Sequence, residues 1–88
     1  MAFQVILTPQ ALDDLRGITT FIAQDNPERA RIFGHELIDR AVSLGTFPER
    51  GRMVPEIREP SVRVIIHGRF RIIYEIFPEQ AVVYVLRF

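Results

Sequence analysis

The 88-residue sequence predicts a single α+β domain over residues 1–88, in which a two-helix antiparallel hairpin packs on one face of a twisted, mainly antiparallel sheet. Two observations predict this fold class: two helical apolar stripes separated by a short polar turn, and three runs of alternating side chains in the last third of the chain. A composition of 48% hydrophobic and 25% charged residues is typical of a globular domain. The expected element order is β-α-α-β-β-β, with one extra short strand allowed.

The N-terminal residues predict a strand followed directly by a helix. Phe3, Val5 and Leu7 alternate with their neighbours, which is typical of a short strand. Thr8 followed by Pro9 is typical of a helix start, with the threonine as cap and the proline at the first helical position. Apolar residues then recur at helical spacing, so this helix is expected to end at about residue 23 or 24.

A second helix is predicted by the same pattern. Asn26 is the expected cap and Pro27 lies just inside the helix, and a regular apolar stripe runs from residue 30 to residue 44 before Gly45 stops it. Gly34 lies on this stripe and would allow close approach of a neighbouring backbone. Because only two or three residues join the helices, they must form an antiparallel hairpin.

The segment 45–60 predicts mainly loop. It contains two glycines and three prolines with little periodicity, and the optional short strand is expected near residues 57–59. Three antiparallel strands are then expected over 61–66, 70–77 and 81–88, because side chains alternate in each run.

Strand register is predicted from this alternation, because residues that pair across strands share a face. Pairing Ile66 with Phe70 leaves a three-residue loop at 67–69, and pairing Phe77 with Ala81 leaves another at 78–80. A two-residue turn at 67–68 is excluded because it mixes the two faces. The expected core face carries Val62, Val64, Ile66, Phe70, Ile72, Tyr74, Ile76, Val82, Tyr84, Leu86 and Phe88.

This register places Arg71 directly across from Arg87, with Arg63 as a diagonal neighbour. Like charges that face each other at ~5 Å destabilise a sheet, so the sequence predicts an anion at these three side chains. Arg52, in the preceding loop, is a further expected anion contact. The alternative is that a carboxylate of the chain itself, such as that of Glu75, Glu59 or the C-terminus, neutralises the cluster.

Composition excludes several classes of function. A net charge of zero excludes a uniformly basic nucleic-acid binder, although residues 50–71 hold six arginines against two glutamates. Cysteine is absent, and His35 and His67 have no partner at ligand spacing, so no metal is expected. No glycine-rich phosphate loop is present, so no cofactor is expected. The start of the chain lacks a signal peptide and no stretch suits a membrane, so the cytoplasm is the expected location.

Any catalysis would rest on the arginines. Guanidinium groups can hold a scissile phosphate and stabilise developing charge, which makes Arg63, Arg71 and Arg87 candidate catalytic residues. Glu49 is the candidate base that goes with them. Tyr74 and Tyr84 share the expected core face, so both are interpreted as packed rings.

The order of several short motifs resembles the RelE/ParE toxin superfamily of type II toxin–antitoxin modules. The motifs are Asn26-Pro27-Glu28 between the helices, the run from Phe47 to Arg52, Pro55-Glu56, Val62-Arg63 and the run from Phe70 to Tyr74. The resemblance covers essentially the whole chain. It implies a RelE-like fold, growth inhibition and plasmid stabilisation, and a cognate antitoxin that forms a hetero-oligomer with the toxin.

Two positions resemble the branch of this superfamily that cleaves mRNA on the ribosome. Arg71 is similar to the residue of that branch that contacts the scissile phosphate, and Arg63 matches another recurrent basic position. Members of the branch commonly continue into a tail bearing His, Tyr or Arg on which cleavage relies, whereas this sequence stops at Arg87-Phe88. Either the sequence is shortened here, or the protein lacks the acid or base of that branch. The basic sheet and the paired long helices also resemble the ParE branch, which poisons DNA gyrase without cutting RNA.

The sequence is therefore compatible with three functions. The first is a ParE-like toxin that inhibits growth by binding a macromolecular target, with DNA gyrase favoured over the ribosome and mRNA. The second is a ribosome-dependent mRNA endoribonuclease of the RelE type. The third is an inactive module that binds only the antitoxin.

Overall fold

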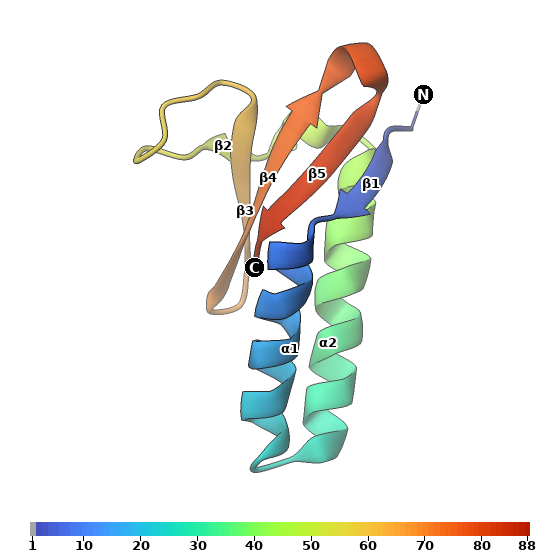
Figure 1. Cartoon of the computed structure of the whole chain (residues 1–88), viewed down its shortest axis with the longest axis vertical. Helices are drawn as coiled ribbons and strands as arrows, with labels where there is room; N and C mark the ends of the chain where they lie inside the picture. The colour runs from blue at the N-terminus through green and yellow to red at the C-terminus, as the bar shows by residue number, and fades with distance from the viewer. Residues whose placement is uncertain (1) are drawn as a thin grey trace.

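The computed structural model describes residues 2–88 and confirms the expected α+β fold. Two helices, α1 (Pro9–Ala23) and α2 (Pro27–Val42), form an antiparallel hairpin beside a five-stranded sheet (Figure 1). The strands are β1 (Gln4–Leu7), β2 (Arg52–Met53), β3 (Val62–His67), β4 (Phe70–Phe77) and β5 (Val82–Arg87), in the order β1-β5-β4-β3-β2. Three 3-10 turns complete the chain: η1 (Ser43–Gly45), η2 (Pro48–Arg50) and η3 (Pro78–Gln80). None of the described helices is long and apolar enough to cross a membrane.

The sheet is mainly antiparallel, as expected, with one parallel pair. β1 runs parallel to β5, whereas β2, β3, β4 and β5 pair antiparallel with their neighbours. The extra short strand is Arg52–Met53, so the expectation of a strand near residues 57–59 is wrong. Those residues lie in a turn that requires a positive φ of 59° at Arg58, which a regular strand cannot contain.

Both helices begin at the predicted caps. The Thr8 hydroxyl accepts a hydrogen bond from the Ala11 N–H at 3.2 Å and donates one to the Val85 carbonyl at 2.8 Å. The first helix is therefore capped and tied to β5 by the same side chain. The Asn26 side chain accepts from the Arg29 N–H at 3.0 Å, and proline follows each cap.

Gly34 allows the two helices to approach closely, as the sequence predicted. A Cβ atom at this position would lie 3.0 Å from the Thr19 Cγ2 atom of α1. A second close contact lies in η1, just after α2, where the Phe3 N–H donates to the Gly45 carbonyl at 2.7 Å. This hydrogen bond fixes the C-terminal side of α2 against the residues that lead into β1.

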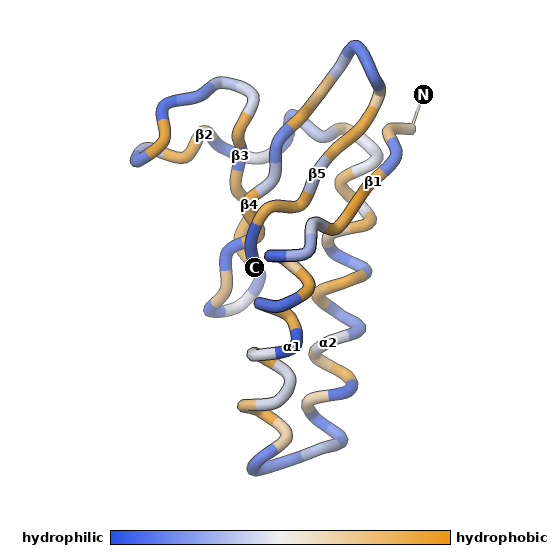
Figure 2. Tube along the Cα trace, in the orientation of Figure 1, coloured by the Kyte–Doolittle hydropathy of each residue, from blue (hydrophilic) through white to orange (hydrophobic). Residues whose placement is uncertain are grey.

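The core lies between the hairpin and one face of the sheet. Hydrophobic residues run along the strands and recur on one side of each helix (Figure 2). A smaller cluster of Val54, Val62 and Val64 lies with Ile73 and Leu86. The main buried cluster contains Ala11, Phe33, Leu37, Ala41, Leu44, Ile65, Ile72, Tyr74, Ile76, Val83 and Val85.

The predicted register between β3 and β4 is wrong. His67 pairs with Phe70, which leaves a two-residue turn at 68–69, and Gly68 adopts a φ of 61° there. A glycine with positive φ at the first turn position is typical of tight hairpins. Ile65 consequently faces the core opposite Ile72, and the set Val62, Val64 and Ile66 lies on the other face.

The predicted register between β4 and β5 is also wrong. Phe77 pairs with Val82 instead of Ala81, because η3 and Ala81, with a φ of 55°, form a longer connection. Val83 and Val85 therefore enter the core, and Tyr84 lies on the opposite face, edge-on to Phe77 at 5.4 Å between ring centroids. Tyr74 is buried as predicted.

Candidate functional site

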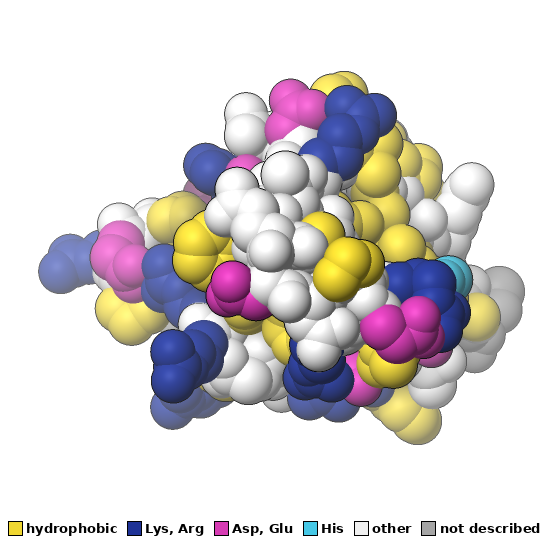
Figure 3. All heavy atoms as spheres, turned by 90° about the horizontal axis from the view of Figure 1, so that it is seen from below, with side chains coloured by type: hydrophobic (Ala, Val, Ile, Leu, Met, Phe, Trp, Pro, Cys, Tyr) yellow, Lys and Arg dark blue, Asp and Glu magenta, His cyan; other side chains and the backbone are white. Residues whose placement is uncertain are grey.

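The three arginines expected to converge are separated in the structure. Arg71 pairs across strands with Ile66, Arg87 pairs with Ile73, and Arg63 pairs with Tyr74. The predicted Arg71–Arg87 pair is wrong because it rested on the wrong register. Figure 3 views the molecule from the end of the hairpin and shows basic side chains at separate places around the rim, several of them beside acidic ones.

Arg87 binds a carboxylate of the first helix. Its Nε atom donates to an Asp14 oxygen at 2.7 Å and its Nη2 atom to the other oxygen at 3.1 Å, a bidentate geometry. The Phe88 N–H also donates to Asp14 at 3.1 Å. Hydrogen bonding by Arg87 lowers the pKa of Asp14, although partial burial opposes this. Arg87 therefore holds the C-terminal residues against α1.

Arg71 is paired with a carboxylate of the loop between β2 and β3. Its Nη1 atom lies 3.2 Å from a Glu56 carboxylate oxygen. A hydrogen bond from the backbone N–H of Glu56 and a second from Arg71 lower the pKa of that carboxyl group. Both side chains are well exposed, 48% for Arg71 and 61% for Glu56, so water screens this pair.

Arg63 holds the loops that flank it. Its Nε atom donates to the Pro60 carbonyl at 3.0 Å, and its Nη1 atom donates to the carbonyls of Glu49 at 3.2 Å and Gly51 at 3.0 Å. All three acceptors are backbone groups. The side chain therefore positions the 49–51 segment, and the part of Glu49 that contacts it is the carbonyl and not the carboxylate.

Tyr74 fixes the same segment from the core. The side chain is completely buried, and its hydroxyl donates to the Pro48 carbonyl at 2.5 Å and accepts from the Gly51 N–H at 3.0 Å. Burial raises the pKa of Tyr74, while the Gly51 N–H and the charges of Arg63 and Arg50 oppose that shift. The phenol is thus neutral at physiological pH and serves as a hydrogen-bonding anchor for η2.

The arginines that do gather are Arg40, Arg50 and Arg52, which we call the arginine patch. They line a hollow of about 290 Å³ whose other walls are Gly51 and residues 64–66 of β3. The Arg50 guanidinium is oriented by the Ser43 hydroxyl, which accepts from Nη2, and by the Thr46 carbonyl at 3.4 Å from Nη1. Within residues 2–88, no carboxylate forms a salt bridge with any of the three.

Sequence reasoning found only Arg52 of the patch. Arg40 lies at the end of α2, and Arg50 reaches it only because Tyr74 and Arg63 hold the intervening segment. The excess of arginines in residues 50–71 indicates a basic surface in this part of the chain. It does not indicate that Arg40, which precedes this range, contributes to the surface.

The hollow is suited to binding more than to acid–base chemistry. Neither histidine lines it: His35 lies on the groove between the helices, and His67 lies 3.6 Å from a Glu36 oxygen. Across the described part of the chain, no group of three His, Cys, Asp or Glu side chains is arranged to hold a metal. The chemistry that remains is recognition of an anion by guanidinium groups.

Three solved structures share this fold. The RelBE2 toxin–antitoxin complex of Mycobacterium tuberculosis matches with a TM-score of 0.74 and 24% identity, over 99% of this chain and 88% of that one. A chromosomal ParDE system of P. aeruginosa matches with a TM-score of 0.77 and 20% identity, over 98% and 92%. A free variant of the E. coli toxin RelE matches with a TM-score of 0.65 and 17% identity, over 99% and 81%. These likenesses show the fold alone.

The family follows from the sequence match. No curated protein matches the chain closely enough to count as a relative. The family model described as the ParE toxin of the type II toxin–antitoxin system parDE, in contrast, matches residues 5–88. The chain therefore belongs to the ParE toxin family of type II toxin–antitoxin systems, within the RelE/ParE superfamily.

Proposed function

We propose that this toxin inhibits growth by binding a protein target, DNA gyrase, and that it does not cut RNA. The observation that carries the proposal is the separation of Arg63, Arg71 and Arg87, each of which contacts protein groups away from the others. Phosphodiester cleavage is favoured where several cationic groups and an acid or base converge on one phosphate, and these three side chains do not converge. The arginine patch, in contrast, offers unpaired charge for binding, and the family match favours the ParE branch.

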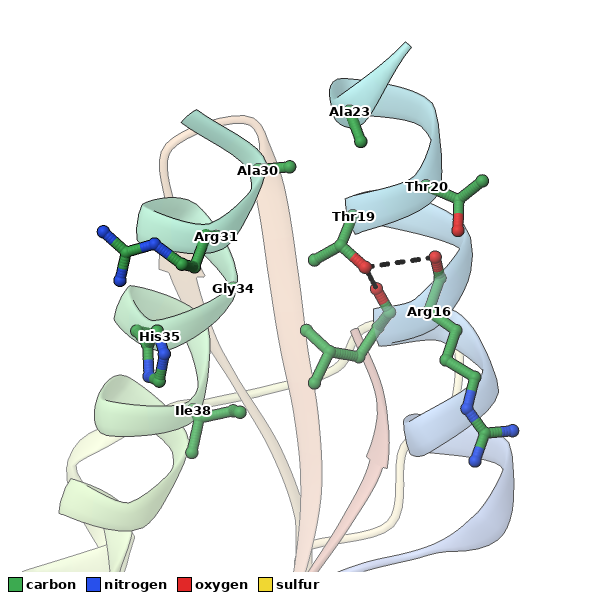
Figure 4. A pocket seen from close by; sticks show the side chains of 10 residues that line it. Arg16, Thr19, Thr20, Ala23, Ala30, Arg31, Gly34, His35 and Ile38 are labelled. Atoms are coloured by element: carbon green, nitrogen blue, oxygen red, sulfur yellow. Dashed lines mark hydrogen bonds between the residues drawn. The ribbon is translucent and has the colours of Figure 1, made fainter. Parts of the chain in front are cut away.

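A cognate antitoxin is the proposed neutralising partner, and it forms a hetero-oligomer with the toxin. Two of the similar structures are described as a toxin–antitoxin complex and a ParDE system. The groove on the outer side of the hairpin offers a surface for it, with a volume of about 460 Å³. Figure 4 shows Ala30, Gly34 and Ile38 of α2 facing Thr19 of α1, whose hydroxyl turns back to the Leu15 carbonyl at 3.0 Å.

The exposed edge of β3 is a second surface proposed for the antitoxin. β2 pairs only with Arg63 and Val64, so the outer side of residues 65–67 has no strand beside it in the described chain. An extended segment can pair with such an edge through its backbone.

One observation favours the second function, ribosome-dependent mRNA cleavage. Arg71 is exposed and its partner Glu56 is exposed too, so a phosphate group can replace that carboxylate at little cost. In this alternative Arg71 contacts the scissile phosphate, Arg63 assists, and Glu49 is the candidate base. Arg87 is less suited, because Asp14 holds it in a bidentate pair.

Expression of the toxin in bacteria, with and without its antitoxin, tests the proposal. We expect growth arrest that the antitoxin relieves, accompanied by relaxed plasmid DNA and intact mRNA. Arrest with fragmented mRNA and normally supercoiled plasmid would support the endoribonuclease instead. Normal growth with soluble, folded toxin would leave only the third interpretation, an inactive antitoxin-binding module.

A further inference from the structure

Phe47 has an unusual backbone conformation and an exposed side chain. Its φ of 54° and ψ of 63° place it in the left-handed region, which is unfavourable for a bulky residue. Its side chain lies 78% exposed, so the contacts of the ring within the domain do not compensate for this conformation. Strained residues of this kind persist where the surroundings enforce them, and they cluster at functional sites.

The residues that follow Phe47 are held from both sides. The Tyr74 hydroxyl donates to the Pro48 carbonyl and accepts from the Gly51 N–H, while Arg63 donates to the carbonyls of Glu49 and Gly51. The Arg50 N–H in turn donates to the Phe47 carbonyl at 3.2 Å. These hydrogen bonds fix the backbone that carries Phe47, and a fixed backbone lowers the entropy lost when a partner binds.

Two of the three arginines of the patch, Arg50 and Arg52, belong to the same segment as Phe47. Arg50 lies three residues after Phe47, and its guanidinium contacts the carbonyl of Thr46, the residue before Phe47. Arg52 and Arg40 line the hollow beside it. Phe47 thus belongs to the same short segment as Arg50 and Arg52, and none of the three arginines of the patch has a carboxylate partner among residues 2–88.

We propose that Phe47 and the arginine patch form the surface that binds an acidic protein segment, with Phe47 inserted into an apolar pocket of the partner. The identity of that partner as the toxin's target rests on the function proposed above. Carboxylates of the segment would accept charge-assisted hydrogen bonds from the three arginines. Aromatic and arginine anchors surrounded by weaker contacts are typical of binding hot spots.

A protein segment fits the charge distribution better than a nucleic acid does. The net charge is zero, and Arg16, Arg29, Arg31, Arg71 and Arg87 are all paired with carboxylates. Arg58, Arg63 and Arg69 also form no salt bridge among residues 2–88, but Arg40, Arg50 and Arg52 are the three that line one hollow. Nucleic-acid binding, in contrast, relies on contacts along a track of phosphates.

Two variants and two matched controls test this surface. Phe47→Gly removes the ring and suits the positive φ, and the triple variant Arg40→Gln, Arg50→Gln, Arg52→Gln removes the charges. The controls are Phe21→Ala, which removes a ring that is 72% exposed on α1, and Arg69→Gln, which removes an exposed arginine in the β3–β4 turn. Thermal unfolding of every variant shows whether it is folded.

Growth arrest and direct binding are then measured separately. We expect Phe47→Gly and the triple variant to lose the arrest and both controls to keep it. Binding to the full chain is measured by fluorescence anisotropy with three probes. One is a short peptide of alternating glutamate and leucine, and the other two are an RNA strand and a DNA strand of the same charge. The peptide should bind best, and Phe47→Gly should weaken it by about tenfold or more. Tighter binding of RNA or DNA, or unchanged binding by folded Phe47→Gly, would overturn the inference.

The growth measurement and the peptide measurement together distinguish a failure of the proposed function from a failure of the proposed surface. If the wild-type toxin causes no arrest, the proposed function fails and the peptide measurement alone decides on the surface. If the wild-type toxin causes arrest but folded Phe47→Gly and the triple variant arrest growth equally well, the function stands and the assigned surface is wrong.

Discussion

The hydroxyl of Tyr74 accepts a hydrogen bond from the backbone N–H of Gly51 at 3.0 Å, and a Cβ atom on that glycine would lie only 2.3 Å from the same oxygen. A buried strand residue thus determines the position of a surface loop 23 residues away in the sequence. Because Arg50 and Arg52 flank Gly51, this contact also fixes the backbone from which two of the three side chains of the arginine patch extend.

Replacement of Tyr74 by phenylalanine tests this anchor. The variant keeps the ring but leaves the Pro48 carbonyl and the Gly51 N–H without their partner, and an unsatisfied buried group costs about 1–3 kcal/mol. We expect a loss of unfolding free energy of about that size in urea titrations. Faster amide exchange should be confined to residues 47–52, and unchanged stability and exchange would show that the hydroxyl does not hold the loop.

Two glycine-to-alanine substitutions should have opposite effects. At Gly51 the new methyl group meets the Tyr74 hydroxyl and the Val64 carbonyl at 2.9 Å, so we expect a destabilisation of about 1–3 kcal/mol. At Gly17, within α1, nothing lies within 4 Å, so alanine should stabilise the helix by about 0.5–1 kcal/mol. Chemical denaturation of both variants checks the prediction, and equal effects would contradict it.

Acid should weaken the link between Asp14 and Arg87. The pKa of Asp14 is lowered in the folded state, mainly by Arg87, so this carboxylate stabilises the fold above its ordinary pKa of about 4 and loses that effect as pH falls through the folded value. The wild-type melting temperature should fall more steeply below about pH 4 than that of Asp14→Asn. Parallel curves for the two proteins would show that the pair contributes nothing.

The helical hairpin could be predicted because its signals are local. Thr8 and Asn26 each cap a helix through an N–H three residues later, and each is followed by proline, so a few neighbouring residues define both starts. The place of Gly34 on the apolar stripe predicted a close approach for the same reason, but it left open whether the neighbour is the first helix or the sheet, and the structure shows the first helix.

Strand register could not be predicted, because apolar residues occupy both faces of β3 and β5. Val64 and Ile65 are both buried, one in each cluster, so alternation alone does not say which of them faces the helices. The pairing of β4 with β5 also contains an irregularity: Ile73 pairs with Arg87 and Tyr74 with Val85, so Leu86 has no partner. The alternation of apolar and polar residues in the sequence does not indicate such a bulge. The error in the arginine cluster followed directly from these two features.

Substitution of Arg71 separates the two mechanisms. In the gyrase-binding account Arg71 forms an exposed pair with Glu56 away from the hollow, so Arg71→Ala should arrest growth as strongly as the wild type. In the endoribonuclease account the same change removes a phosphate contact and should relieve the arrest. Colony counts after induction decide between them, provided immunoblots show equal amounts of both proteins.

The most direct test of the account uses the purified toxin in two assays at matched concentrations: supercoiling of a relaxed plasmid by DNA gyrase, and cleavage of mRNA on translating ribosomes. We predict that the wild-type toxin inhibits supercoiling, that the triple arginine variant does not, and that the mRNA stays intact. Cleavage of ribosome-bound mRNA with no effect on supercoiling would contradict the account.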